Sequence, residues 1–110
     1  EVNVETSKQF NKILQYINDN LSQEITLKHL ADFVYLNPQY VGQLFKSELN
    51  QTFTEYITEE RLKRAKQLLK DTSLKVYEVA QLSGYKSPKH FMTVFKQEVG
   101  TTPVQFRNYS

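Results

Sequence analysis

Few residues in this sequence could carry catalysis or hold a metal ion. The 110 residues include no Cys, which excludes disulfides, thiolate zinc sites and cysteine nucleophiles. The two histidines, His29 and His90, have no ligand partner one helical turn away, so a metal site is not expected. Glu59 and Glu60 are adjacent and diverge on a helix, and no Gly-rich phosphate loop is present. We therefore expect neither an enzyme nor a cofactor.

Amide and cationic side chains, by contrast, recur on the outer face of two segments whose other face is apolar. Gln can pair with both N6 and N7 of adenine in the major groove of DNA, and Lys neutralises phosphate. The side chains that we expect to contact bases are Gln39, Tyr40, Gly42, Gln43, Lys89, His90, Met92 and Thr93. The side chains that we expect to contact phosphate are Lys46, Lys96, Ser87 and Thr102.

Each of these assignments has a simpler alternative. Gly42 costs about 1 kcal/mol of helix propensity, and it either lets the backbone approach a duplex closely or is merely tolerated. Lys46 and Lys96 could be ordinary surface charges, and helix capping is the more common role of hydroxyls such as those of Ser87 and Thr102.

Apolar residues at helical spacing predict the elements that position these side chains. The first helix is expected over about 6–21. Cap and proline signals then place helix starts at Thr26, Asn37-Pro38, Thr54, Ser73, Ser87-Pro88 and Thr102-Pro103. Asn50, Gly84 and Gly100 are expected to end helices. We predict an all-α fold of seven helices, in which Phe45, Phe91, Phe95 and Phe106 are core residues.

The two halves of the sequence repeat one another. Leu27, Leu30 and Ala31 match Val76, Val79 and Ala80 at an offset of 49, and Asn37-Pro38 matches Ser87-Pro88 at an offset of 50. Core positions, caps and terminators all coincide. The repeated unit is a short helix, a tight turn and a longer helix, which is typical of a helix-turn-helix motif. An α-solenoid fits less well, because solenoids need about three repeats or more.

Charge and composition place loose limits on the partner. The net charge is +2, but residues 1–45 hold three Lys and five acidic residues, whereas residues 46–110 hold eleven basic and seven acidic ones. This bias is compatible with a polyanion, and also with an ordinary solvated surface. No apolar run approaches the roughly 18 residues of a membrane span. Because Met92 is the only Met, we expect a piece of a longer protein.

Two stretches of the sequence carry a family resemblance: LADFVYLNPQYVGQLFKSELNQTFTEYITEERLKRAKQLL and VYEVAQLSGYKSPKHFMTVFKQEVGTTPVQFR. Their marks are Leu44-Phe45-Lys46, the pattern of Arg61, Leu62, Ala65, Leu68 and Leu69, the Gly84-Tyr85 turn, and the tail Phe95, Lys96, Gly100, Thr102, Pro103 and Arg107. The sequence resembles the DNA-binding domain of AraC/XylS-type bacterial transcription regulators over about residues 8–109, and its turn and tail look like those of members fused to response-regulator receiver domains. Asn50 departs from the usual Gly, and Gly42 replaces a larger residue.

The resemblance implies one domain over residues 1–110, with a first subunit at about 6–53, a linker helix at about 54–71 and a second subunit at about 73–109. A linker of about 27 Å could hold two recognition helices near the spacing of successive major grooves, about 34 Å. Expected partners are double-stranded DNA, RNA polymerase and a missing N-terminal regulatory domain, in the cytoplasm and without a membrane. The alternatives are a helical protein-interaction module without specific DNA reading, and a domain in which one unit alone reads bases. Arg61 is expected to be structural, paired with an acid or with carbonyl groups.

Overall fold

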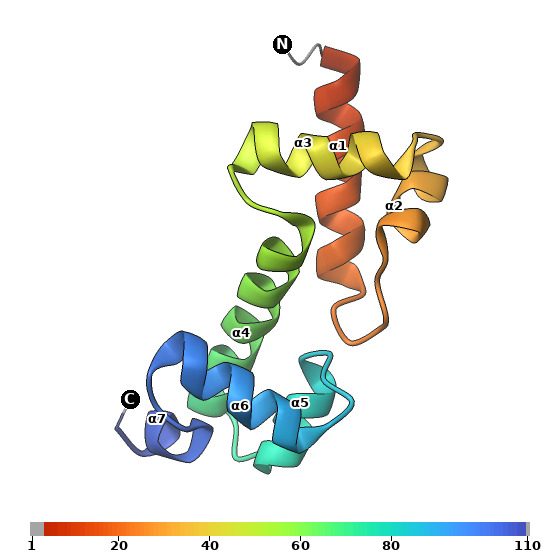
Figure 1. Ribbon diagram of the computed structural model, residues 1–110. Coiled ribbons are helices and arrows are strands. Elements are labelled where there is room, and N and C mark those ends of the chain that lie inside the picture. The colour runs from red at the N-terminus through yellow and green to blue at the C-terminus, as the bar shows by residue number, and fades with distance from the viewer. Residues whose placement is uncertain (1–3, 110) are drawn as a thin grey trace. The chain divides into compact units, whose positions relative to one another are not determined.

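The computed structural model describes residues 4–109 and contains, over that range, seven α-helices and no strand (Figure 1). The prediction of an all-helical fold is confirmed. In chain order the helices are α1 (Val4–Asp19), α2 (Leu27–Val34), α3 (Pro38–Leu49), α4 (Phe53–Asp71), α5 (Val76–Leu82), α6 (Pro88–Val99) and α7 (Pro103–Tyr109).

The chain divides within α4 into two units, unit 1 up to Thr58 and unit 2 from Glu59. The first half of α4 joins the core of unit 1 through Tyr56 and Ile57. The second half joins the core of unit 2 through Leu62, Ala65 and Leu69. The helix expected as a linker is therefore also a structural part of both cores, because each half buries its own apolar residues.

The core of unit 1 forms where α1, α2 and α3 meet. Ile13 and Ile17 of α1 are fully buried, as is Leu30 of α2. Phe45 of α3 lies at the centre with no exposed surface, and its ring is 5.1 Å from that of Phe10 in an edge-on arrangement. Burial of side chains of this size stabilises the unit by about 1.5–3 kcal/mol each.

The core of unit 2 forms between the second half of α4 and helices α5, α6 and α7. Phe91 and Phe95, one turn apart on α6, have no exposed surface, and their ring centroids are 5.6 Å apart. Phe106 of α7 is half-buried and packs edge-on against Phe95 at 5.6 Å. The prediction that these phenylalanines are core residues is confirmed.

Most predicted helix starts are confirmed by the capping geometry. The side-chain oxygens of Thr26, Asn37 and Ser87 accept the N–H groups of His29, Gln39 and His90, respectively. The Thr102 hydroxyl accepts the N–H of Gln105, and the Gln105 side chain accepts the N–H of Thr102. These reciprocal bonds satisfy donors that a helix start otherwise leaves unpaired.

Three predicted boundaries are wrong. The first helix runs from Val4 to Asp19, and Leu21 is buried in the turn that follows it. The fourth helix is capped by Thr52 rather than by Thr54, because Thr52 and Glu55 exchange hydrogen bonds of 2.8 and 3.0 Å. Ser73 does not cap the fifth helix.

The fifth helix instead begins after Lys75, which occupies the N-cap position. The Lys75 N–H donates to the carboxylate of Glu78 at 2.9 Å. The Glu78 carboxylate in the first turn thus accepts the N–H of the N-cap residue, and the predicted N-cap at Ser73 lies two residues too early.

The two helix-turn-helix motifs differ in their turns. The residue that follows α2 is Tyr35, which adopts a left-handed φ of 58°, whereas unit 2 has Gly84 at φ 97°. Asn50 (φ 54°) and Gly100 (φ 96°) end α3 and α6, as predicted. Glycine adopts these angles without strain, and a tyrosine does not.

Candidate nucleic-acid interface

Helix α3 presents a polar face opposite its buried residues. Gln39, Gln43 and Lys46 are exposed, and Tyr40 retains 40% of its surface. The buried face consists of Val41, Leu44 and Phe45. Because these apolar residues pack the helix against the core, the exposed amide side chains are held on a rigid helix.

Gly42 does not share this exposure. It is half-buried, and a Cβ built on it would lie 3.6 Å from Cδ1 of Leu27 on α2. This is an ordinary van der Waals distance, so the position faces α2 and has room for a methyl group. The sequence prediction placed Gly42 with the exposed readers because its neighbours in the sequence are polar, but packing against α2 turns it partly inward.

Helix α6 presents the corresponding face in unit 2. Lys89, His90, Thr93 and Lys96 are exposed, and Met92 retains 43% of its surface. The Thr93 hydroxyl donates to the carbonyl oxygen of Lys89 at 3.0 Å. That bond occupies the hydroxyl proton and leaves the Thr93 methyl as an apolar group suited to contact with a thymine methyl.

The imidazole of His90 has a neighbour that the sequence analysis did not assign to it. The ring of Tyr85, in the turn before α6, lies 5.8 Å from the His90 ring at an interplanar angle of 56°. Tyr85 is only 8% exposed. In the sequence, the Gly-aromatic pair Gly84-Tyr85 indicates a turn and does not indicate which side chain the tyrosine ring contacts.

Arg61 is half-buried on α4, and burial lowers its pKa below the ordinary value. Its guanidinium interacts electrostatically with Tyr85, and burial raises the pKa of Tyr85, which therefore keeps its phenolic proton at neutral pH. Arg61 thus lies on the inner side of its helix, as its place on the apolar stripe predicts.

The two hydroxyls proposed for phosphate contact both cap helices. The Ser87 Oγ accepts the His90 N–H at 3.2 Å, and the Thr102 Oγ1 accepts the Gln105 N–H at 3.1 Å. Capping uses an oxygen lone pair and leaves the hydroxyl proton to bind an external acceptor. Of the two, Ser87 is exposed and Thr102 is half-buried.

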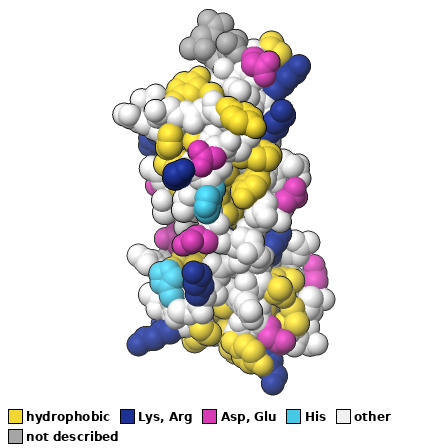
Figure 2. All heavy atoms as spheres, turned by 90° about the vertical axis from the view of Figure 1, so that its right-hand side faces the viewer, with side chains coloured by type: hydrophobic (Ala, Val, Ile, Leu, Met, Phe, Trp, Pro, Cys, Tyr) yellow, Lys and Arg dark blue, Asp and Glu magenta, His cyan; other side chains and the backbone are white. Residues whose placement is uncertain are grey.

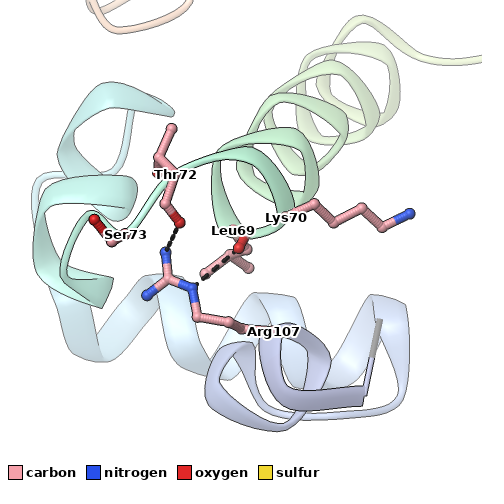
Figure 3. A pocket seen from close by; sticks show the side chains of 5 residues that line it. All are labelled: Leu69, Lys70, Thr72, Ser73 and Arg107. Atoms are coloured by element: carbon pink, nitrogen blue, oxygen red, sulfur yellow. Dashed lines mark hydrogen bonds between the residues drawn. The ribbon is translucent and has the colours of Figure 1, made fainter.

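Arg107 in the tail closes the end of α4 (Figure 3). Its Nε donates to the Leu69 carbonyl at 3.0 Å, and one terminal nitrogen donates to the Thr72 carbonyl at 3.2 Å. Both oxygens lie at the C-terminal end of the helix, where carbonyls lack intrahelical partners and a cation is favoured. Lys70 and Ser73 also line the surrounding pocket. Its arginine, Arg107, is already hydrogen-bonded to backbone carbonyls.

Within each unit, basic and acidic side chains are scattered on the face shown in Figure 2, and neither sign forms a dense patch there. Within residues 4–109, no group of three or more His, Cys, Asp or Glu side chains is placed to hold a metal ion. In the same range, no helix is both long and apolar enough to cross a membrane. The arrangement offers hydrogen bonding and phosphate neutralisation by two helices.

Comparison with known proteins places the chain among regulators. Residues 30–109 match the family described as a helix-turn-helix domain. The chain is 39% identical over 100 residues to the uncharacterized transcriptional regulatory protein YesN of Bacillus subtilis, covering 87% of this chain and 27% of YesN. It therefore spans about a quarter of the length of that curated relative.

Two solved structures resemble the fold. The C-terminal domain of AraT, a response regulator from Geobacillus stearothermophilus, is 33% identical with a TM-score of 0.89, over 93% of this chain and 85% of that one. The DNA-binding domain of the global transcriptional factor AdpA, solved with a target DNA, has a TM-score of 0.86 over 91% of this chain and 90% of that one; its 21% identity supports the fold alone. Matched over most of its length, with both repeated motifs in place, the chain belongs to the AraC-type family of helix-turn-helix domains.

Proposed function

We propose that this chain binds double-stranded DNA sequence-specifically as the DNA-binding domain of a bacterial transcription regulator. The observation that carries the proposal is the pair of helices, α3 and α6, each locked by buried phenylalanine and each exposing amide or cationic side chains. The domain structure of AdpA in complex with a target DNA supports the same reading of the fold.

In this proposal each of the two helices contacts both bases and phosphates, through different side chains. Gln39 and Gln43 of α3 and Lys89 and His90 of α6 contact base edges in successive major-groove segments. Lys46 and Lys96 contact phosphate, which positions the protein and supplies affinity without sequence information. Tyr40, Met92 and Thr93 add apolar contacts to bases, and Ser87 and Thr102 donate to phosphate where their caps allow.

The relatives are longer regulators, which supports a proposal for the wider role of the full-length protein. We infer that a further regulatory domain senses a signal, that the activated protein contacts RNA polymerase, and that it acts in the cytoplasm, where bacterial DNA lies. A response-regulator receiver is the favoured regulatory domain, because the AraT structure is the C-terminal domain of a response regulator. The domain performs no chemistry and needs no cofactor.

The decisive experiment is selection of binding sites from a random-sequence duplex pool, repeated at two salt concentrations. Two information-rich blocks about one helical turn apart are expected if both helices read bases. A single block means that one unit reads and the other positions. If the protein binds duplexes but enriches no sequence, and this binding falls steeply as the salt concentration rises, the result contradicts sequence specificity. No binding at low salt favours a protein-interaction module instead.

Two substitutions test the division of work on the selected site. Gln43→Ala should cost about 1–3 kcal/mol on the selected site and relax preference at one base pair. Lys96→Ala should weaken binding to all sequences alike and reduce the salt slope by about one unit. Gln67→Ala and Lys12→Ala, exposed positions on α4 and α1, are the matched controls. Equal weakening of every sequence by Gln43→Ala would remove its assignment as a base reader.

A further inference from the structure

The side chain of Tyr85 is held from several directions within unit 2. Its backbone N–H donates to the Ala80 carbonyl at 2.9 Å, which fixes the turn to the end of α5. Its ring lies 5.3 Å from the fully buried Phe91 ring, and only 8% of its surface is exposed. Tyr85 is therefore a fixed surface rather than a mobile side chain.

His90 lies on that surface in the first turn of α6. Its backbone is fixed by the hydrogen bond from its N–H to Ser87, while its imidazole is exposed and meets the ring of Tyr85 at 5.8 Å. An exposed histidine on a helix ordinarily exchanges among staggered χ1 rotamers. Tilted contact with an aromatic ring favours the rotamer that makes it.

The orientation of the ring matters more for an imidazole than for most side chains that contact bases. A neutral histidine has one ring nitrogen that donates and one that accepts. Turning the ring about χ1 or χ2 changes whether a ring nitrogen or a C–H group faces a base pair. Because major-groove edges differ in the order of donors and acceptors, an unfixed imidazole distinguishes them poorly.

Unit 1 has no equivalent arrangement. Leu36 follows the turn residue there, where unit 2 has Tyr85, and Tyr40 takes the place of His90. Within residues 4–109, the Tyr40 ring pairs with no other aromatic ring. The ring contact is thus a property of one motif and not a requirement of the helix-turn-helix geometry.

We propose that Tyr85 is a positioning residue for DNA reading, which holds the His90 imidazole in one orientation so that it discriminates one base pair. The inference rests on the proposed function and deepens it by assigning specificity to a buried residue that does not touch DNA itself.

The test uses the chain and the duplex selected from the random pool, with variants Tyr85→Leu, Tyr85→Phe, His90→Ala and the double variant Tyr85→Leu/His90→Ala. We expect Tyr85→Leu and His90→Ala each to lower the preference at the same base pair by about fivefold or more. The double variant should match His90→Ala alone, and Tyr85→Phe should keep the preference. Additive losses, or equal weakening of all sequences by Tyr85→Leu, would overturn the inference.

A second measurement remains decisive if Tyr85→Leu does not fold. Three-bond couplings and nuclear Overhauser contacts of His90 in the unliganded wild-type chain should show one χ1 rotamer against Tyr85. Averaging over rotamers overturns the positioning role. If the wild-type chain enriches no sequence, the proposed function itself fails; an enriched site with unchanged preference in Tyr85→Leu removes the positioning role alone.

Discussion

The two helix-turn-helix motifs share one framework and differ where they face solvent. Both recognition helices start with Pro after a capping side chain, and both bury a phenylalanine, Phe45 or Phe95, with no exposed surface. Their outer faces diverge: α3 offers uncharged Gln39 and Gln43, whereas α6 offers Lys89 and His90. The repeat thus preserves the residues that folding requires and varies the side chains that a ligand would meet.

The strongest test of this comparison removes the matching core phenylalanines. Phe45→Ala and Phe95→Ala should each lower the free energy of unfolding by about 3–5 kcal/mol, because each ring is fully buried among other rings. Since the two residues belong to separate cores, amide exchange should rise in α1–α3 for Phe45→Ala and in α5–α7 for Phe95→Ala. Equal loss of protection throughout the chain in both variants would show that the two cores unfold as one.

The next test concerns the turns. Tyr35 is 94% exposed at φ 58°, so Tyr35→Gly should relieve about 1–2 kcal/mol of left-handed strain and lose few contacts. The greater flexibility of glycine in the unfolded chain offsets about 0.5–1 kcal/mol of this, which leaves a net stabilisation. Gly84→Ala at φ 97° should destabilise by about 1–2 kcal/mol.

Thermal unfolding of both variants measures the difference, at roughly 4–8 °C per kcal/mol for a chain of this size. A lower melting temperature for Tyr35→Gly would mean that the tyrosine ring makes stabilising contacts despite its exposure.

A smaller effect is expected from Gly42, for which unit 2 has Met92. Gly42→Ala should raise the stability by about 0.5–1 kcal/mol, because the new methyl meets Leu27 at an ordinary distance and the helix propensity improves. Denaturant unfolding measures the stability, and titration of the selected duplex measures the affinity. Unchanged affinity would mean that Gly42 is merely tolerated, and a loss of affinity in the more stable variant would support close approach of the backbone to DNA.

The smallest effect is a pH dependence that should distinguish the start of α4, where Thr52 and Glu55 exchange hydrogen bonds, from the start of α7, where Thr102 and Gln105 do so. Glu55 accepts the backbone N–H of Thr52, and this bond lowers the pKa of Glu55. Desolvation opposes the shift, and the Thr52 hydroxyl and Lys46 make smaller contributions that also lower the pKa. The folded pKa lies below the unfolded value, so the stabilisation is present above about pH 4.5 and is lost as the pH falls through the folded pKa.

Gln105 occupies the corresponding position in unit 2 and does not titrate. Amide exchange between pH 3 and 6 should therefore show acid weakening at the start of α4 and not of α7. Glu55→Gln should remove that pH dependence. Weakening of both helix starts, in wild type and variant alike, would assign the effect to other carboxylates.

The sequence permitted prediction of the helices because periodicity, caps and terminators agree at most boundaries. The prediction of an N-cap at Ser73 was wrong because a hydroxyl caps a helix only where the chain enters one. The helix begins after Lys75 instead, where the Glu78 carboxylate accepts the Lys75 N–H. Gly42 was misplaced because helical spacing alone does not say how closely α2 crosses α3. The ring contact between Tyr85 and His90 was missed because it depends on the conformation of a turn, for which the sequence carries only the Gly-aromatic signal.

The bonds from Arg107 to the end of α4 have a consequence for how the chain acquires its structure during synthesis. The carbonyls that it satisfies lie 38 and 35 residues earlier. At about 5–20 residues per second, the ribosome needs a few seconds to make that stretch. The residues of unit 1 are complete before the second half of α4 receives this partner. During synthesis the residues of the first motif are therefore present early, whereas the carbonyls at the last turn of α4 lack their hydrogen-bond donor until Arg107 is added.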